Sequence, residues 1–135
     1  QEPRLLSKGN DLTIIASGFS TKVACDASTI LQTQYGLSVE IIDLRILSPL
    51  KSEKLLYSVN KTKRLVVVDG GWKNCGIASE IMASIYEGIE LNNLKNKPLR
   101  ICLPATPAPT AHTLEKNYYL DAEVVAKKIA YHLSL

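Results

Sequence analysis

The fold is decided by the stretch Leu65-Val66-Val67-Val68-Asp69-Gly70-Gly71-Trp72. Its four consecutive branched apolar residues lack the alternation of a half-exposed strand, so they predict a strand buried on both faces, as in the middle of a parallel sheet. The paired glycines Gly70 and Gly71 predict a sharp turn directly after it. We therefore expect residues 64–69 to form the central strand of a parallel sheet.

Shorter apolar runs on either side predict the remaining strands at residues 12–16, 39–43 and 99–103, with residues 5–7 as a short antiparallel edge strand. Stretches of helical periodicity separate these runs. Strands that alternate with helices form βαβ units, whose helices cover both faces of a parallel sheet. The sequence thus predicts an α/β fold, a three-layer α/β/α sandwich with about five mostly parallel strands.

Capping signals mark the ends of the predicted helices. Ser20 or Thr21 is expected to cap the first helix, and Gly36 to end it in a left-handed conformation. Ser52 is expected to cap the second helix and Asp121 the last. The buried side of the last helix is predicted to carry four apolar residues: Val124, Val125, Ile129 and Leu133.

Composition narrows the function classes. The chain has 135 residues, enough for one domain over residues 1–135, and a net charge of +3 that is small and scattered. We expect no nucleic-acid partner, and we interpret Lys61, Lys63 and Arg64 as the solvated end of a helix. No apolar run has the length of a membrane span and we expect no signal peptide, so no membrane partner is expected. We interpret the three cysteines as reduced thiols of an intracellular protein.

Metal and disulfide chemistry is not indicated either. The three cysteines Cys25, Cys75 and Cys102 are widely spaced and form no CxxC pair, and the chain has two histidines. An odd number of separated thiols fits neither a zinc site nor a disulfide framework. We expect no metal ligands in this domain.

Ligands of a parallel sheet bind at the carboxyl ends of its strands, where this sequence offers four loops. In the first, Gly18, Ser20 and Thr21 precede a helix, whose N–H groups attract anions. The motif is neither a dinucleotide nor a Walker loop, so it is a weak anion-site candidate. In the second loop, Asp43 and Arg45 are expected to form an ion pair that organises the chain.

The third and fourth loops suggest contacts with partners more than chemistry. Trp72 in the third loop is either an interface anchor or a cap on the core. The fourth loop carries three candidate interface residues, Pro107, Pro109 and His112. His112 has no nucleophile placed beside it, so these loops supply no catalytic set and no cofactor ligands.

Taken in order, the motifs resemble a known family. The matching segments are Gly9-Asn10-Asp11-Leu12-Thr13-Ile14-Ile15-Ala16, Val39-Glu40-Ile41-Ile42-Asp43-Leu44-Arg45-Ile46-Leu47-Ser48-Pro49-Leu50, residues 58–62, residues 64–72, Gly76-Ile77-Ala78-Ser79-Glu80-Ile81, Thr106-Pro107-Ala108-Pro109 and Leu114-Glu115. Together they resemble the transketolase C-terminal domain in the E1 β subunit of pyruvate-type 2-oxoacid dehydrogenases. The match covers essentially the whole chain.

The resemblance implies an enzyme part that does no chemistry by itself. Intact E1 enzymes are oxidoreductases that hold thiamine diphosphate and Mg²⁺ between a pyrophosphate-binding and a pyrimidine-binding domain. In the family the pyrimidine-binding domain precedes this one, so we expect residues 1–135 to be a fragment that lacks it. The implied roles are contacts with the E1 α subunit and a second β subunit, and docking of the peripheral subunit-binding domain of E2, in a bacterial cytoplasm or an organelle.

One departure bears on E2 docking. Lys95 stands where the family often has an acidic residue that helps to hold the basic E2 domain. Like-charge repulsion would weaken that contact, so docking would need a different E2 or other groups, such as the Leu135 carboxylate. Two alternatives remain open: the same domain of a transketolase or deoxyxylulose-phosphate synthase, and a stand-alone module for small anions.

Overall fold

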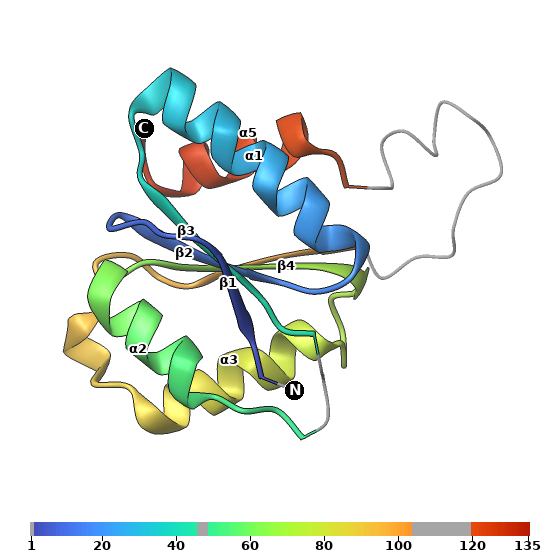
Figure 1. The fold of residues 1–135 in the computed structure, drawn as a ribbon, viewed down its shortest axis with the longest axis vertical. Coiled ribbons are helices and arrows are strands. Elements are labelled where there is room, and N and C mark those ends of the chain that lie inside the picture. Colours follow the sequence, from blue (N-terminus) through green and yellow to red (C-terminus); the bar gives the residue numbers. More distant parts are fainter. Residues whose placement is uncertain (1, 46–48, 104–119) are drawn as a thin grey trace, which may run out of the picture.

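The computed structural model, which describes residues 2–45, 49–103 and 120–135, is a three-layer α/β/α sandwich (Figure 1). One five-stranded sheet separates α1 and α5 on one face from α2 and α3 on the other. This arrangement confirms the predicted fold class.

The sheet has the strand order β1-β3-β2-β4-β5. Its strands are β1 (Arg4–Ser7), β2 (Leu12–Ala16), β3 (Val39–Asp43), β4 (Leu65–Trp72) and β5 (Leu99–Leu103). β1 pairs antiparallel with β3 and the other pairs are parallel, which confirms the predicted edge strand. The centre of the sheet is β2, however, and the prediction that β4 would occupy it was wrong. Both strands have runs of fully buried residues, so apolar content does not rank one interior strand above another.

The glycine pair does not make the predicted turn. β4 continues through Gly70 and Gly71 to Trp72, and neither glycine has a positive φ. Instead, the pairing with β5 becomes irregular between Val68 and Trp72. Residues without a side chain suit such a bulge as well as they suit a turn. The chain leaves the strand direction later, near Cys75, which has φ 56°.

The first helix, α1 (Phe19–Tyr35), follows Gly18 and has no side-chain cap, so the prediction that Ser20 or Thr21 would cap it was wrong. Both residues lie inside the first turn, two and three positions after the capping position at Gly18. The helix ends at Gly36 in the left-handed region (φ 65°), as predicted.

The remaining helices are α2 (Glu53–Thr62), α3 (Ile77–Gly88), the short 3-10 helix η1 (Leu91–Asn93) and α5 (Ala122–His132). Ser52 precedes α2 as predicted, although its hydroxyl makes no capping bond. Asp121 caps α5 by accepting the Val124 N–H at 2.8 Å, which confirms that prediction. The prediction that Val124 lies on the buried side of this helix was wrong, because the residue is 37% exposed.

Successive residues of each strand point to opposite faces and so build two cores. Ile14 joins the cluster under α1 and α5, and Ile15 the cluster under α2 and α3. The same alternation separates Ile41 from Ile42 in β3. Each face of the sheet thereby presents a largely apolar surface to its pair of helices.

Candidate functional site

In the loop after β2, the groups available to bind an anion are mainly backbone N–H groups. Gly18 is exposed with φ 57°, but the Ser20 side chain is 5% exposed. The Thr21 hydroxyl donates to Asp43 Oδ1 at 3.4 Å. The first turn of α1 holds no acidic residue, so its positive dipole end is not neutralised from within the turn.

Asp43 organises its loop differently from the prediction. The backbone N–H of Arg45 donates to Asp43 Oδ1 at 3.3 Å, and no ion pair joins the two side chains. Arg45 has φ 60°, so the chain closes a tight Asx-type turn on the carboxylate. The expected Asp43–Arg45 contact is therefore present through the backbone, and the predicted ion pair was wrong.

The end of β4 presents the tryptophan singled out in the sequence. Trp72 is 55% exposed and belongs to neither apolar cluster, so it does not cap the core. Just before it, Asp69 accepts the N–H of Gly71 at 3.2 Å, which fixes the backbone that leads to the indole. An exposed indole on a fixed backbone is typical of interface anchors.

The buried thiols are not set up as nucleophiles. Burial raises the pKa of Cys102, and the carboxylate of Asp69 adds to that effect. Burial likewise raises the pKa of Cys25, with smaller contributions from Asp26 and Asp43. Both side chains are therefore neutral thiols at neutral pH.

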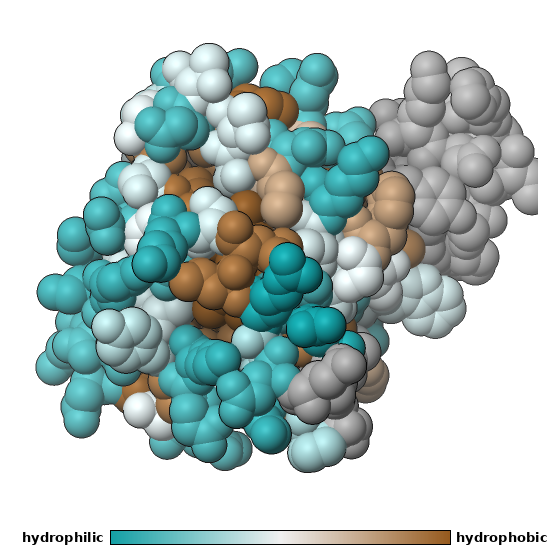
Figure 2. Space-filling model, in the orientation of Figure 1, coloured by the Kyte–Doolittle hydropathy of each residue, from teal (hydrophilic) through white to brown (hydrophobic). Residues whose placement is uncertain are grey.

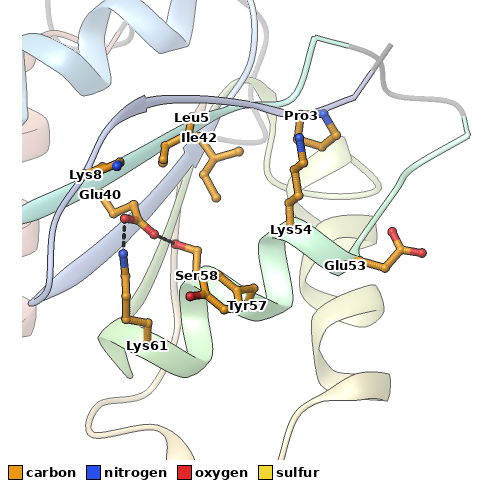
Figure 3. Close-up of a pocket in the computed structure, with 10 residues that line it drawn as sticks. All are labelled: Pro3, Leu5, Lys8, Glu40, Ile42, Glu53, Lys54, Tyr57, Ser58 and Lys61. Atoms are coloured by element: carbon orange, nitrogen blue, oxygen red, sulfur yellow. Dashed lines mark hydrogen bonds and ion pairs between the residues drawn. The ribbon is translucent and has the colours of Figure 1, made fainter.

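A buried polar cluster, which the sequence analysis missed, lies at the opposite end of the sheet (Figure 3). Glu40 in β3 accepts hydrogen bonds from the Ser58 hydroxyl and the Lys61 ammonium of α2, each at 2.5 Å. Behind them the hydroxyl of Thr13 lies 2.8 Å from that of Ser58 and 2.7 Å from that of Thr62. The cluster ties α2 to the two strands it covers.

The charge on Glu40 is well compensated. Burial by itself raises the pKa of this carboxyl, but hydrogen bonds from Lys61, Ser58 and the Gly9 N–H outweigh burial and hold the pKa below its usual range. Glu40 is thus an ionised, structural carboxylate. The signal available in the sequence was a charged residue within an otherwise apolar strand, because such a charge requires a buried partner.

Two of the other predicted contact residues can be placed, Lys95 and Leu135. Lys95 is exposed, and its N–H donates to the Lys63 carbonyl at 2.8 Å. Leu135 is 52% exposed, and its N–H donates to the Ala130 carbonyl. Pro107, Pro109 and His112 lie outside the described residues.

Among the described residues, the carboxyl edge of the sheet offers no metal site for a cofactor such as thiamine diphosphate with Mg²⁺. Within residues 2–45, 49–103 and 120–135 no group of three or more His, Cys, Asp or Glu side chains is placed to hold a metal ion. Asp43 and Asp69 at this edge accept hydrogen bonds from backbone N–H groups.

The helices in residues 2–45, 49–103 and 120–135 include none whose length and apolar character would allow it to span a bilayer.

Comparisons with known proteins agree on one family. The family model for the C-terminal domain of transketolase matches residues 2–125. The β subunit of acetoin:2,6-dichlorophenolindophenol oxidoreductase from Cupriavidus necator is 37% identical over 93% of this chain and 36% of its own length. The mitochondrial pyruvate dehydrogenase E1 component subunit beta of Saccharomyces cerevisiae is 30% identical over 95% of this chain and 35% of its own. Its counterpart from Rickettsia conorii is 31% identical over 97% and 40%.

The structural likeness points the same way. The solved structure of a split-gene transketolase, an inactive β4 tetramer, matches 99% of this chain and 43% of its own with a TM-score of 0.82 at 24% identity, which shows a shared fold. The chain spans between about a third and two fifths of the length of the curated relatives it matches. These findings confirm the resemblance seen in the sequence.

Proposed function

The chain belongs to the transketolase C-terminal domain family, and on that premise we propose that it is the C-terminal domain of the β subunit of a 2-oxoacid dehydrogenase E1. The observation that carries the proposal is the identity of 30–37% to β subunits over 93–97% of the chain. The split-gene transketolase is similar to this chain in structure at 24% sequence identity, and a likeness at that level supports the fold alone.

Within such an enzyme the domain works in assembly. The oxidative decarboxylation would depend on thiamine diphosphate and Mg²⁺ held by other domains, and within the described ranges no group of side chains is placed to hold the metal. Trp72, exposed at the end of β4, is our leading candidate for contact with the E1 α subunit or a second β subunit. We propose a mitochondrial or a bacterial location, because the similar β subunits come from the mitochondrion of Saccharomyces cerevisiae and from Rickettsia conorii.

E2 docking is the finer part of the proposal. Lys95 and Lys97 are both exposed in the segment that follows η1, and they give it a positive charge. A basic E2 domain would be repelled there, so we propose that this segment either meets an acidic partner or lies outside the docking site.

Purification of the native protein from its source with its bound subunits tests the proposal. We expect an α-type E1 subunit to co-purify in equal amount, because both chains are needed to enclose the cofactor. Recovery of the native protein without any second subunit type would contradict the E1 assignment.

A small-anion module is the second candidate. It is favoured by the uncapped first turn of α1, which lacks both a side-chain cap and an acidic residue. Phosphate titration followed by the amide shifts of Gly18, Ser20 and Thr21 tests it. An absence of shifts at millimolar phosphate would end this alternative.

A further inference from the structure

A groove of about 590 Å³ lies between β1 and β3 on one side and α2 on the other (Figure 3). Its apolar lining includes Leu5 of β1, Ile42 of β3 and Tyr57 of α2. A volume of this size is typical of sites for small organic molecules. The groove lies beside the outermost strand β1, which is not a neighbour of β4 and its exposed Trp72.

The groove exists because α2 does not reach the outermost strand. Leu55 and Val59 of α2 pack in one cluster with Ile15 of β2 and Ile42 of β3. Leu5 of β1 is absent from both clusters and is 45% exposed. Figure 2 shows an apolar area bordered by hydrophilic residues where β1 crosses the front of the molecule in Figure 1.

Among the described residues, an unpaired positive charge is available at one end of the groove, at Lys8. Three lysines line it: Lys54 pairs with Glu2 at 2.9 Å, and Lys61 pairs with Glu40. Lys8 also lines it, and within the described ranges no hydrogen bond or ion pair engages its ammonium. Two acidic residues line the groove: Glu40, drawn at the same end as Lys8, is paired with Lys61, and Glu53 is drawn at the opposite end in Figure 3.

The edge strand itself is poorly suited to pair with a peptide. β1 has four residues, and its register with β3 is irregular between Leu5 and Ser7. The basic side chains of Arg4 and Lys8 stand at its two ends. Short, charged and irregular edges discourage the addition of another strand. A compact ligand therefore fits this place better than an extended peptide.

We propose that the groove binds a small amphipathic carboxylate, with its apolar body against Leu5, Ile42 and Tyr57 and its carboxylate at Lys8. Contact with an apolar wall supplies affinity, and a charge-assisted hydrogen bond to the ammonium supplies selectivity for anions. The site is independent of the E1 assignment, and neither proposal depends on the other.

Titration of the ¹⁵N-labelled chain with sodium octanoate tests the site, and octylammonium chloride serves as the probe of opposite charge. Octanoate is expected to shift the amides of Leu5, Lys8, Ile42 and Tyr57 in a saturable manner, while octylammonium leaves them in place. Lys8→Met should weaken octanoate binding about tenfold, as expected for the loss of one charge-assisted hydrogen bond.

Matched control variants distinguish binding at the groove from non-specific binding of the probes. Lys128→Met, the same change at an exposed position of α5, should leave the affinity unchanged, and Tyr57→Ala should lower it. Equal binding of both probes, or unchanged affinity in Lys8→Met, would overturn the proposal. The proposal would also be overturned if an acidic peptide of valine and aspartate displaced octanoate and protected the β1 amides from hydrogen exchange. The groove would then be a strand-addition site.

Discussion

The ammonium of Lys61 lies 2.5 Å from a carboxylate oxygen of Glu40, whose side chain is only 3% exposed, whereas that of Lys61 is 35% exposed. The pair joins the last turn of α2 to the interior of the sheet. Three donors converge on the buried carboxylate, so its charge is compensated by hydrogen bonds as well as by the cation. The pair therefore fixes α2 on the sheet and with it one wall of the groove.

Removing the cation should destabilise the fold. Lys61→Met leaves Glu40 charged and buried with two donors, so we expect the free energy of unfolding to fall by about 1–3 kcal/mol. Urea unfolding followed by circular dichroism measures the change. Lys128→Met, on the exposed side of α5, is the control and should have little effect. Equal losses in the two variants would contradict a stabilising role for the pair.

Stability should depend on pH through Glu40. Because the folded-state pKa of this carboxyl is lowered, its contribution is present above the unfolded pKa of about 4.3 and is lost as the pH falls through the folded value. We expect Glu40→Gln to lower stability at pH 7 and to flatten the loss on acidification. Urea midpoints at neutral and acidic pH test this, and parallel profiles for both proteins would refute it.

Gly9 allows two backbone segments to approach each other. A Cβ at Gly9 would lie 2.2 Å from the Val39 carbonyl carbon, so Gly9→Ala forces the backbone apart and disturbs the Gly9–Glu40 bond. We expect a loss of about 1–3 kcal/mol. Gly70→Ala is the matched control, because its Cβ would meet only the Ser20 hydroxyl at 3.3 Å. A larger loss for Gly70→Ala in urea unfolding would contradict this account.

Trp72→Ala should separate assembly from folding. The indole is 55% exposed and outside both cores, so the isolated chain should lose about 1 kcal/mol or less. The subunit assembly of the full protein, measured by analytical ultracentrifugation, should be weakened markedly. If the melting temperatures of the chain and the assembly fall equally, Trp72 contributes to folding and not to the interface.

Lys95→Glu should strengthen binding to a basic E2 docking domain. The side chain is exposed, so reversal of its charge replaces repulsion by attraction without disturbing the core. Isothermal calorimetry should show several-fold tighter binding at low salt. Lys22→Glu, an exposed position of α1, controls for net charge, and an unchanged Lys95→Glu affinity would remove this residue from the interface.

The sequence predicted most of the fold because the fold depends on periodicity. The strands at residues 12–16, 39–43 and 99–103 and the left-handed end of α1 at Gly36 were all confirmed. These features follow from local residue patterns. The position of β4 beside the centre was not predictable in this way, because strand order depends on how the crossovers pack.

The polar interactions were harder to predict. Lys61 was interpreted as a solvated residue, since nothing local indicates that the buried Glu40, 21 residues earlier, is its partner. Gly70 and Gly71 suited either a turn or a bulge, and pairing with β5 selected the bulge. The groove beside β1 was missed as well, because it arises from where α2 ends its contact with the sheet and not from any motif.

The mass of the native protein, measured by immunoblot of its source with an antibody against this domain, tests the central claim most directly. We predict a polypeptide about two and a half to three times as long as this chain, because the matched stretch is 36% and 40% of two β-subunit relatives. A native protein no larger than this domain would contradict the assignment to an E1 β subunit.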